Sequence, residues 1–138
     1  MRLIVVQNGK LKDTHCIALR DEYCKRFGRF GKLEIIERKA KPGQSLWPRC
    51  DWRVLLDERG ERFTSPALAD KLAQWSMTKG TIAFALGEAH GHDDATRAEA
   101  DVLWSLSDLV LPHQIAHVVV VEQLYRAATI QAGVDYHH

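Results

Sequence analysis

Short apolar runs alternate with segments of helical periodicity along the chain, and this alternation limits the possible folds more than any other feature. Runs typical of buried strands lie at residues 1–7, 32–39, 52–57 and 81–86. Patterns typical of helices cover residues 11–27, 65–79, 94–103 and 112–132. Strands that alternate with helices predict an α/β domain with a mostly parallel sheet flanked by helices.

Local signals refine the ends of these elements. Ser65 is predicted as the N-cap of a helix, with Pro66 as its first helical residue and Gly80 at its end. Residues 40–51 connect two predicted strands, but their two prolines and one glycine disfavour a helix, so we expect an extended loop. Residues 104–111 (WSLSDLVL) are typical of a short strand or an ordered loop.

Length and composition indicate the class of protein. With 138 residues, of which 46% are hydrophobic, residues 1–138 are expected to form a single domain. The longest apolar run, at residues 118–121, is far too short for a membrane span, so we expect no membrane partner, and no signal peptide is expected. Three cysteines without a CxxC pair argue against a disulfide framework and favour a reducing cytoplasm.

Charge is distributed unevenly between the two halves of the chain. Residues 1–62 carry 15 basic and 9 acidic side chains, whereas residues 63–138 carry 4 basic and 9 acidic ones. A basic half is compatible with a phosphate-bearing partner such as nucleic acid. A solvated surface without such a partner explains the same counts.

The last predicted helix is apolar around most of its circumference. Of the 16 residues at 115–130, 11 are apolar. Such a helix must be buried on two sides. We expect the sheet to cover one side and a second subunit the other, which predicts a homodimer.

The carboxyl ends of the strands are the expected ligand-binding edge of a parallel sheet. Here that edge would lie near Asp57, residues 87–91 and Leu111. Gly87 and Gly91 would let a ligand approach the backbone closely. The turn is neither a P-loop nor a GxGxxG motif, so an ordinary strand-to-helix loop explains it equally well.

Histidines concentrate in the last third of the chain. His113 and His117 have the i, i+4 spacing of a zinc-binding helix, but Gln114 stands where a metalloprotease needs its general-base Glu. His90 and His92 could supply further ligands. Hydrogen-bonded or surface histidines are the more common situation, so we predict no metal site.

Several motifs together resemble one known family. They are WSLSDLVLPHQIAHVVVVEQLYRA at 104–127, FALGEAHG at 84–91, LDERG at 56–60 and the closing Tyr136-His137. These resemble the SPOUT-class methyltransferases that modify N3 of a pseudouridine in large-subunit ribosomal RNA. The resemblance covers nearly the whole chain.

The resemblance implies a SPOUT fold with a carboxyl-terminal trefoil knot, a homodimer, S-adenosylmethionine as cofactor, and ribosomal RNA or the assembled ribosome as partner. Residues expected near the substrate, and therefore expected to be catalytic, are Arg126, Tyr136, His137 and His113. Residues expected to touch the cofactor are Leu56, Gly87, Glu88, Gly91, Leu106, Ser107, Asp108, Leu109, Val110 and Leu111.

Three departures from the family pattern keep two alternatives open. Glu88 stands where the family has the second glycine of the turn. The helix that the family has between its second and third strands is not expected at residues 40–51, and His117 replaces an Arg of the family. A side chain at position 88 would crowd the cofactor turn. The alternatives are a SPOUT-like dimer that binds RNA or a nucleotide without methyl transfer, and a small His-rich metal-binding protein.

Overall fold

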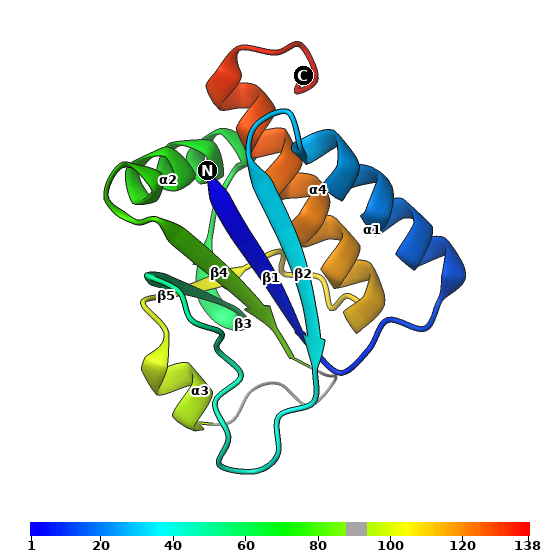
Figure 1. The fold of residues 1–138 in the computed structure, drawn as a ribbon, viewed down its shortest axis with the longest axis vertical. Helices are drawn as coiled ribbons and strands as arrows, with labels where there is room; N and C mark the ends of the chain where they lie inside the picture. The colour runs from blue at the N-terminus through cyan, green and yellow to red at the C-terminus, as the bar shows by residue number, and fades with distance from the viewer. Residues whose placement is uncertain (88–93) are drawn as a thin grey trace.

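The computed structural model describes residues 1–87 and 94–138, and within them five parallel strands form one sheet in the order β2-β1-β4-β3-β5 (Figure 1). The strands are β1 (Arg2–Asn8), β2 (Lys32–Arg38), β3 (Trp52–Arg62), β4 (Thr81–Leu86) and β5 (Val102–Ser105). The helices are α1 (Thr14–Phe27), α2 (Ser65–Thr78), α3 (Asp94–Glu99) and α4 (His113–Ala132). The α/β class with a parallel sheet is therefore confirmed.

Several predicted boundaries differ from the structure. The helix predicted from residue 11 begins at Thr14, and the strand predicted within residues 104–111 is Val102–Ser105. The N-cap of α2 is Thr64, whose hydroxyl accepts from the Ala67 N–H, so the prediction of Ser65 is wrong by one residue. The helix predicted at 94–103 ends at Glu99, because β5 begins at Val102. β3 continues past its expected end at Asp57 to Arg62.

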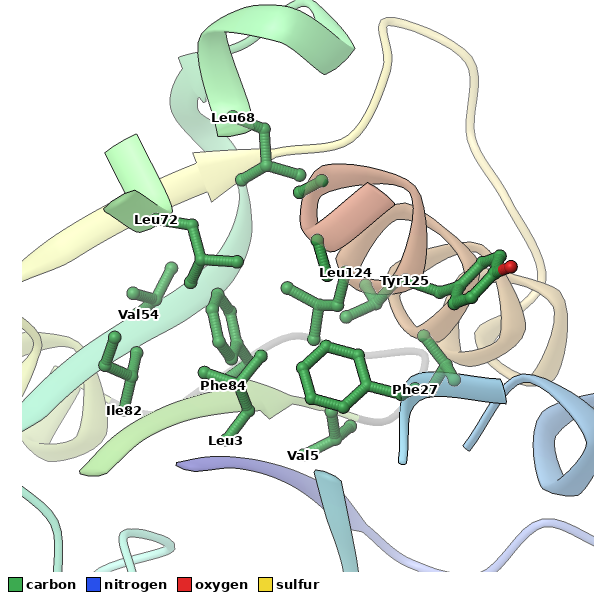
Figure 2. Close-up of a cluster of buried hydrophobic side chains, with 14 of the residues drawn as sticks. Leu3, Val5, Phe27, Val54, Leu68, Leu72, Ile82, Phe84, Leu124 and Tyr125 are labelled. Carbon is green, nitrogen blue, oxygen red and sulfur yellow. The ribbon is translucent and has the colours of Figure 1, made fainter. Parts of the chain in front are cut away.

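Three helices cover one face of the sheet (Figures 1 and 2). Alternate strand residues such as Leu3, Val5 and Phe84 point to this face, where they meet Phe27 of α1 and Leu124 of α4. These side chains are almost completely buried. This is the larger of the two clusters of buried apolar side chains, and each Å² of apolar surface that it removes from water stabilises the fold by about 25 cal/mol.

The opposite face is covered by α3 and by the irregular segment 40–51. Leu46 and Trp47 of that segment are buried against Ile4, Val6 and Ala83, which alternate with the residues of the first face. The Trp47 indole N–H donates to the Thr96 carbonyl oxygen of α3 at 3.3 Å. The extended loop expected at 40–51 is confirmed. Its Leu46 and Trp47 side chains cover this face of the sheet, as a crossover helix would in its place.

α4 lies between α1 and α2, so this chain itself covers more of the helix than the sequence suggested. The Tyr23 ring of α1 lies 5.8 Å from the Tyr125 ring, and the Gln131 amide donates to the Ala69 carbonyl of α2 at 3.0 Å. The apolar circumference of α4 is therefore covered in large part within one chain, and by itself it does not require a second subunit. Among the described residues, no helix is long and apolar enough to cross a membrane.

Candidate functional site

Strand register brings three of the predicted cofactor segments to one edge of the sheet. Leu55 pairs with Ala85 of β4, so Leu56 and Leu86 lie one step further along. Leu56 also pairs with Trp104 of β5. Gly87 and residues 106–111 therefore leave the sheet at nearly the same level as Leu56, at the carboxyl ends of adjacent strands, where open parallel sheets bind ligands.

A bulge in β3 borders this edge. The pairing of β3 with β5 shifts between Leu56 and Glu61, so residues 57–60 form an insertion in the strand. At its end the Gly60 backbone approaches Leu103 so closely that any β-carbon would overlap the Leu103 carbonyl. Most of the LDERG motif at 56–60 therefore forms the bulge, which lies beside the expected cofactor segments.

Asp57 anchors the bulge. Its carboxylate accepts from the Arg59 backbone N–H at 2.9 Å and from the Arg97 guanidinium of α3 at 2.8 Å. Burial alone would raise the pKa of Asp57, but the Arg59 hydrogen bond and the Arg97 and Arg59 charges outweigh it and hold that pKa below its usual value. Asp57 is therefore ionised and structural, with its oxygens already engaged.

The segment at 106–111 makes contacts through residues 107 and 108, and its next two residues are exposed. The Arg62 guanidinium pairs with Asp108, and the Ser107 hydroxyl oxygen accepts from the Leu109 N–H at 2.9 Å. Leu109 and Val110 are 75% and 92% exposed. Adjacent aliphatic side chains this exposed are unusual on a protein surface and favour a contact with another molecule.

The carboxyl end of β1 and the beginning of α4 meet beside the same edge. The ring nitrogen Nδ1 of His117 lies 2.9 Å from Gln7 Oε1, and both side chains are completely buried. Gln7 Nε2 donates to the carbonyl oxygens of Asn8 at 3.1 Å and Gly87 at 3.4 Å. Burial lowers the pKa of His117 to about 4, and the Arg20 charge adds to this, so the imidazole is neutral.

Two polar atoms at this edge are buried without a hydrogen-bond partner among the described residues. They are Asn8 Oδ1, at the end of β1, and His117 Nε2. Unpaired buried acceptors are rare and mark places where a further group can bind. Together with the three backbone segments, they make the edge compatible with a polar cofactor such as S-adenosylmethionine.

A second cluster contains three of the four residues predicted near the substrate. Arg126 donates to Glu122 Oε1 through Nη2 at 2.8 Å and contacts His137 Nδ1 through Nη1 at 3.1 Å. Its guanidinium carbon lies 4.7 Å from the centre of the Tyr136 ring, and the Tyr136 hydroxyl donates to Glu122 at 2.9 Å. The Glu122 carboxylate thus holds Arg126 and Tyr136 together, and Arg126 in turn contacts His137.

The protonation states of this cluster follow from its contacts. Burial raises the pKa of Tyr136, and the neighbouring Tyr23 hydroxyl and Glu122 carboxylate raise it further. The phenol is therefore protonated at neutral pH. Because a guanidinium only donates, His137 Nδ1 accepts from Arg126. Because the Tyr136 O–H is already donated to Glu122, the cluster presents the Arg126 cation and its remaining N–H donors, which suit a phosphate or a base carbonyl.

The structure separates this cluster from the edge of the sheet where the cofactor is expected, called the cofactor edge below. α4 begins at the carboxyl ends of the strands and ends near their amino ends, close to the carboxyl terminus (Figure 1). His113 is its first residue, and Arg126 lies 13 residues further on. At 1.5 Å per residue the separation is about 20 Å. His113 therefore lies with the cofactor segments and apart from Arg126, Tyr136 and His137.

Some predicted residues lie outside the described part of the chain, namely Glu88, Gly91, His90 and His92. His113 and His117, which have the spacing of a zinc-binding helix, lie in different environments: His117 is buried against Gln7, whereas His113 is exposed. Across residues 1–87 and 94–138, no group of three or more His, Cys, Asp or Glu side chains could hold a metal ion.

Sequence reasoning missed Gln7, Glu122 and Arg97. A signal existed for the first two. Gln7 is a polar residue at the end of an otherwise apolar strand, and Glu122 stands four residues before Arg126, the spacing of a helical ion pair. Nothing in the sequence pairs Arg97 with Asp57, because the two are 40 residues apart.

Comparisons with known proteins point to one family. A family model described as predicted SPOUT methyltransferase matches residues 1–137. A protein of Deinococcus radiodurans, named ribosomal RNA large subunit methyltransferase H, is 40% identical over 144 residues, which cover 99% of each chain.

Two solved structures share the fold at 13% identity. A probable methylase family protein from Haemophilus influenzae has a TM-score of 0.62 and covers 99% of this chain and 70% of its own. The SpoU methyltransferase AviRb from Streptomyces viridochromogenes, in complex with AdoMet, has a TM-score of 0.51 and covers 95% of this chain and 60% of its own. At such low identity these likenesses concern the fold alone.

Proposed function

The chain belongs to the SPOUT methyltransferase family, as its motifs indicated, and from this membership we propose that it methylates large-subunit ribosomal RNA. The full-length relative named ribosomal RNA large subunit methyltransferase H is the observation that carries the proposal. The proposed cofactor is S-adenosylmethionine, and the proposed acceptor atom is N3 of a pseudouridine. Such a substrate would place this single-domain protein in the cytoplasm.

Bound S-adenosylmethionine would supply a methyl group on a sulfonium centre. The described residues that would hold it are the backbone at Leu56 and Gly87 and the segment 106–111, which register brings to one edge. The task of the protein is to hold N3 in line with that methyl group, because alignment removes much of the entropic barrier. From the family motif, Glu88 and Gly91 are also proposed to contact the cofactor.

Arg126, Tyr136 and His137 are proposed to bind the RNA. The Arg126 guanidinium has further N–H donors for a phosphate or a base carbonyl, while Glu122 keeps it in place and accepts the Tyr136 O–H. His113 is proposed to act at the cofactor edge, where α4 begins.

The distance between the two clusters supports a homodimer. Within one chain Arg126 lies about 20 Å along α4 from His113, too far for both to contact one nucleotide. Two copies related by a two-fold axis, with their α4 helices running in opposite directions, would place Arg126 of one beside the cofactor edge of the other. The exposed Leu109, Val110 and Ile115 would lie in that interface.

Methyl incorporation tests the proposal directly. Purified protein, isotopically labelled S-adenosylmethionine and large ribosomal subunits lacking the modification are mixed, and the RNA nucleosides are analysed by mass spectrometry. We expect label on one pseudouridine. Free ribosomal RNA and assembled ribosomes are compared in the same assay to identify the form that is recognised.

Two variants make the assay specific. Arg126→Ala should reduce methyl transfer at least tenfold while the dissociation constant for S-adenosylmethionine stays unchanged. Arg49→Ala is the control, because Arg49 is exposed in segment 40–51 on the opposite face of the sheet. Binding of RNA and cofactor without incorporation would instead support the SPOUT-like dimer without methyl transfer.

A further inference from the structure

The buried contact between His117 and Gln7 has a defined proton arrangement. Gln7 faces two backbone carbonyls, those of Asn8 and Gly87, and carbonyls only accept hydrogen bonds. The amide NH₂ must therefore face them, so Gln7 Oε1 faces His117. Since that oxygen also only accepts, the proton of the imidazole lies on Nδ1, and Nε2 is bare.

The contact connects three elements at the cofactor edge. His117 belongs to α4, Gln7 to β1, and Gly87 begins the turn after β4. Gln7 pairs with Leu86 in the sheet, so its side chain is already adjacent to that turn. A hydrogen bond from the imidazole restricts rotation of the Gln7 amide, and the amide in turn fixes the direction of the Gly87 carbonyl.

We propose that His117 and Gln7 are positioning residues for Gly87, the first residue after β4 at the expected cofactor edge. His117 fixes the Gln7 amide, and Gln7 holds the Gly87 carbonyl in one direction before S-adenosylmethionine binds. The inference rests on the proposed function, because it assigns the turn to that cofactor. Preorganisation of this kind increases affinity by lowering the ordering cost of binding.

The direct test is calorimetric titration of the full chain with S-adenosylmethionine. Gln7→Leu removes both halves of the connection at similar volume, and His117→Phe keeps a ring while removing its nitrogens. Each should weaken binding about three- to tenfold, the size expected when one orienting hydrogen bond is lost. Because the residues act in series, the double variant should lose little more than either single variant.

Thr129→Val is the matched control for loss of stability. Thr129 is completely buried on the same helix, and its hydroxyl donates to the Arg126 carbonyl at 2.6 Å, away from the cofactor edge. We expect this variant to lower the melting temperature and leave the dissociation constant unchanged. Equal weakening in Thr129→Val would show that general loosening explains the effect, and would overturn the inference.

A spectroscopic measurement tests the proton arrangement independently of the cofactor. The ¹⁵N spectrum of the His117 ring should show a protonated Nδ1 and a bare Nε2 near neutral pH. Gln7→Leu should shift the amide signal of Gly87, and Thr129→Val should not. A proton on Nε2, or wild-type cofactor affinity in both Gln7→Leu and His117→Phe, would overturn the inference.

The two proposals fail in distinguishable ways. A wild-type protein that does not bind S-adenosylmethionine contradicts the proposed function. In that case the ring spectrum and the Gly87 signal still decide whether His117 and Gln7 hold the Gly87 carbonyl. A wild-type protein that binds and methylates, with variants that bind equally well, contradicts only the positioning role.

Discussion

Arg97 contacts one carboxylate oxygen of Asp57 through both Nε and Nη2, each at 2.8 Å. The Asp57 side chain is 4% exposed and that of Arg97 24%. The contact joins α3, which covers one face of the sheet, to the bulge that borders the cofactor edge on β3. An ion pair this well shielded depends on both partners, because an unpaired buried charge is costly.

Asp57→Asn should therefore destabilise the fold by about 1–3 kcal/mol, measured by urea denaturation near neutral pH. Asn keeps an oxygen for the Arg59 N–H but removes the charge that balances Arg97. The control is Glu22→Gln, which breaks an exposed pair with Arg26 on α1 and should cost no more than about 0.5 kcal/mol. Equal losses in the two variants would contradict the structural role of Asp57.

Gly60→Ala should be among the most destabilising single-methyl substitutions in the chain. The new β-carbon would overlap the backbone carbonyl of Leu103, and a backbone atom cannot rotate away as a side chain can. We expect a loss of about 3 kcal/mol or more in the free energy of unfolding, together with weaker cofactor binding because the bulge must move.

Gly43→Ala provides the comparison. Gly43 has φ +82° but no atom within 4 Å of a β-carbon, so only backbone strain opposes alanine there. That strain is about 1 kcal/mol, which the same urea denaturation resolves from the larger loss. If Gly60→Ala is no worse than Gly43→Ala, β5 does not approach Gly60 as closely as described.

His117 should make the fold sensitive to acid. Burial lowers its pKa to about 4 in the folded protein, while the unfolded chain has the ordinary value of about 6.5. Between these values the unfolded state binds more protons, so stability is complete above the unfolded value and falls as the pH decreases toward 4. The expected loss from about pH 7.5 to about pH 5 is about 2 kcal/mol.

The pH dependence is isolated by comparing wild type with His117→Phe in urea denaturation at both pH values. The difference between the two proteins cancels the other titrating groups. We expect the variant to lose less stability on acidification than wild type. Identical slopes would mean that the imidazole titrates normally and is not buried as described.

Much of this fold follows from periodicity because its elements are strongly patterned. β4 was predicted with its bounds, and Pro112 and Gly133 delimit α4 as expected. Gly133 adopts φ 68°, the left-handed conformation that ends helices. The errors lie where tertiary contacts prevail over local signals, as at β5, whose pairing with β3 ends the helix predicted at 94–103.

The sequence indicated the parts of the candidate site but not their arrangement. Motif resemblance named the expected cofactor segments and substrate residues, and strand register brings Leu56, Gly87 and residues 106–111 to one edge. The separation of His113 from Arg126 depends on how α4 runs relative to the sheet, which no local pattern contains. Gln7 and Arg97 act through partners distant in sequence, so only the folded structure identifies them.

The outer face of α4 tests the proposed dimer. Ile115 is 47% exposed and Val119 is half-buried, whereas Leu124 is completely buried against the sheet of its own chain (Figure 2). Leu124→Asp would therefore unfold the protein and report nothing on assembly. Ile115→Asp and Val119→Asp place a charge in the proposed interface while leaving the core intact.

We expect wild type to sediment as a dimer at micromolar concentration and both variants to shift toward monomer. Methyl transfer should fall in parallel, because Arg126 of the partner copy would no longer reach the cofactor edge. Met77→Asp is the matched control, since Met77 is 85% exposed on α2, outside the proposed interface. A monomeric wild type that still methylates RNA would contradict the dimer, and the RNA would then have to span the distance from His113 to Arg126 on a single chain.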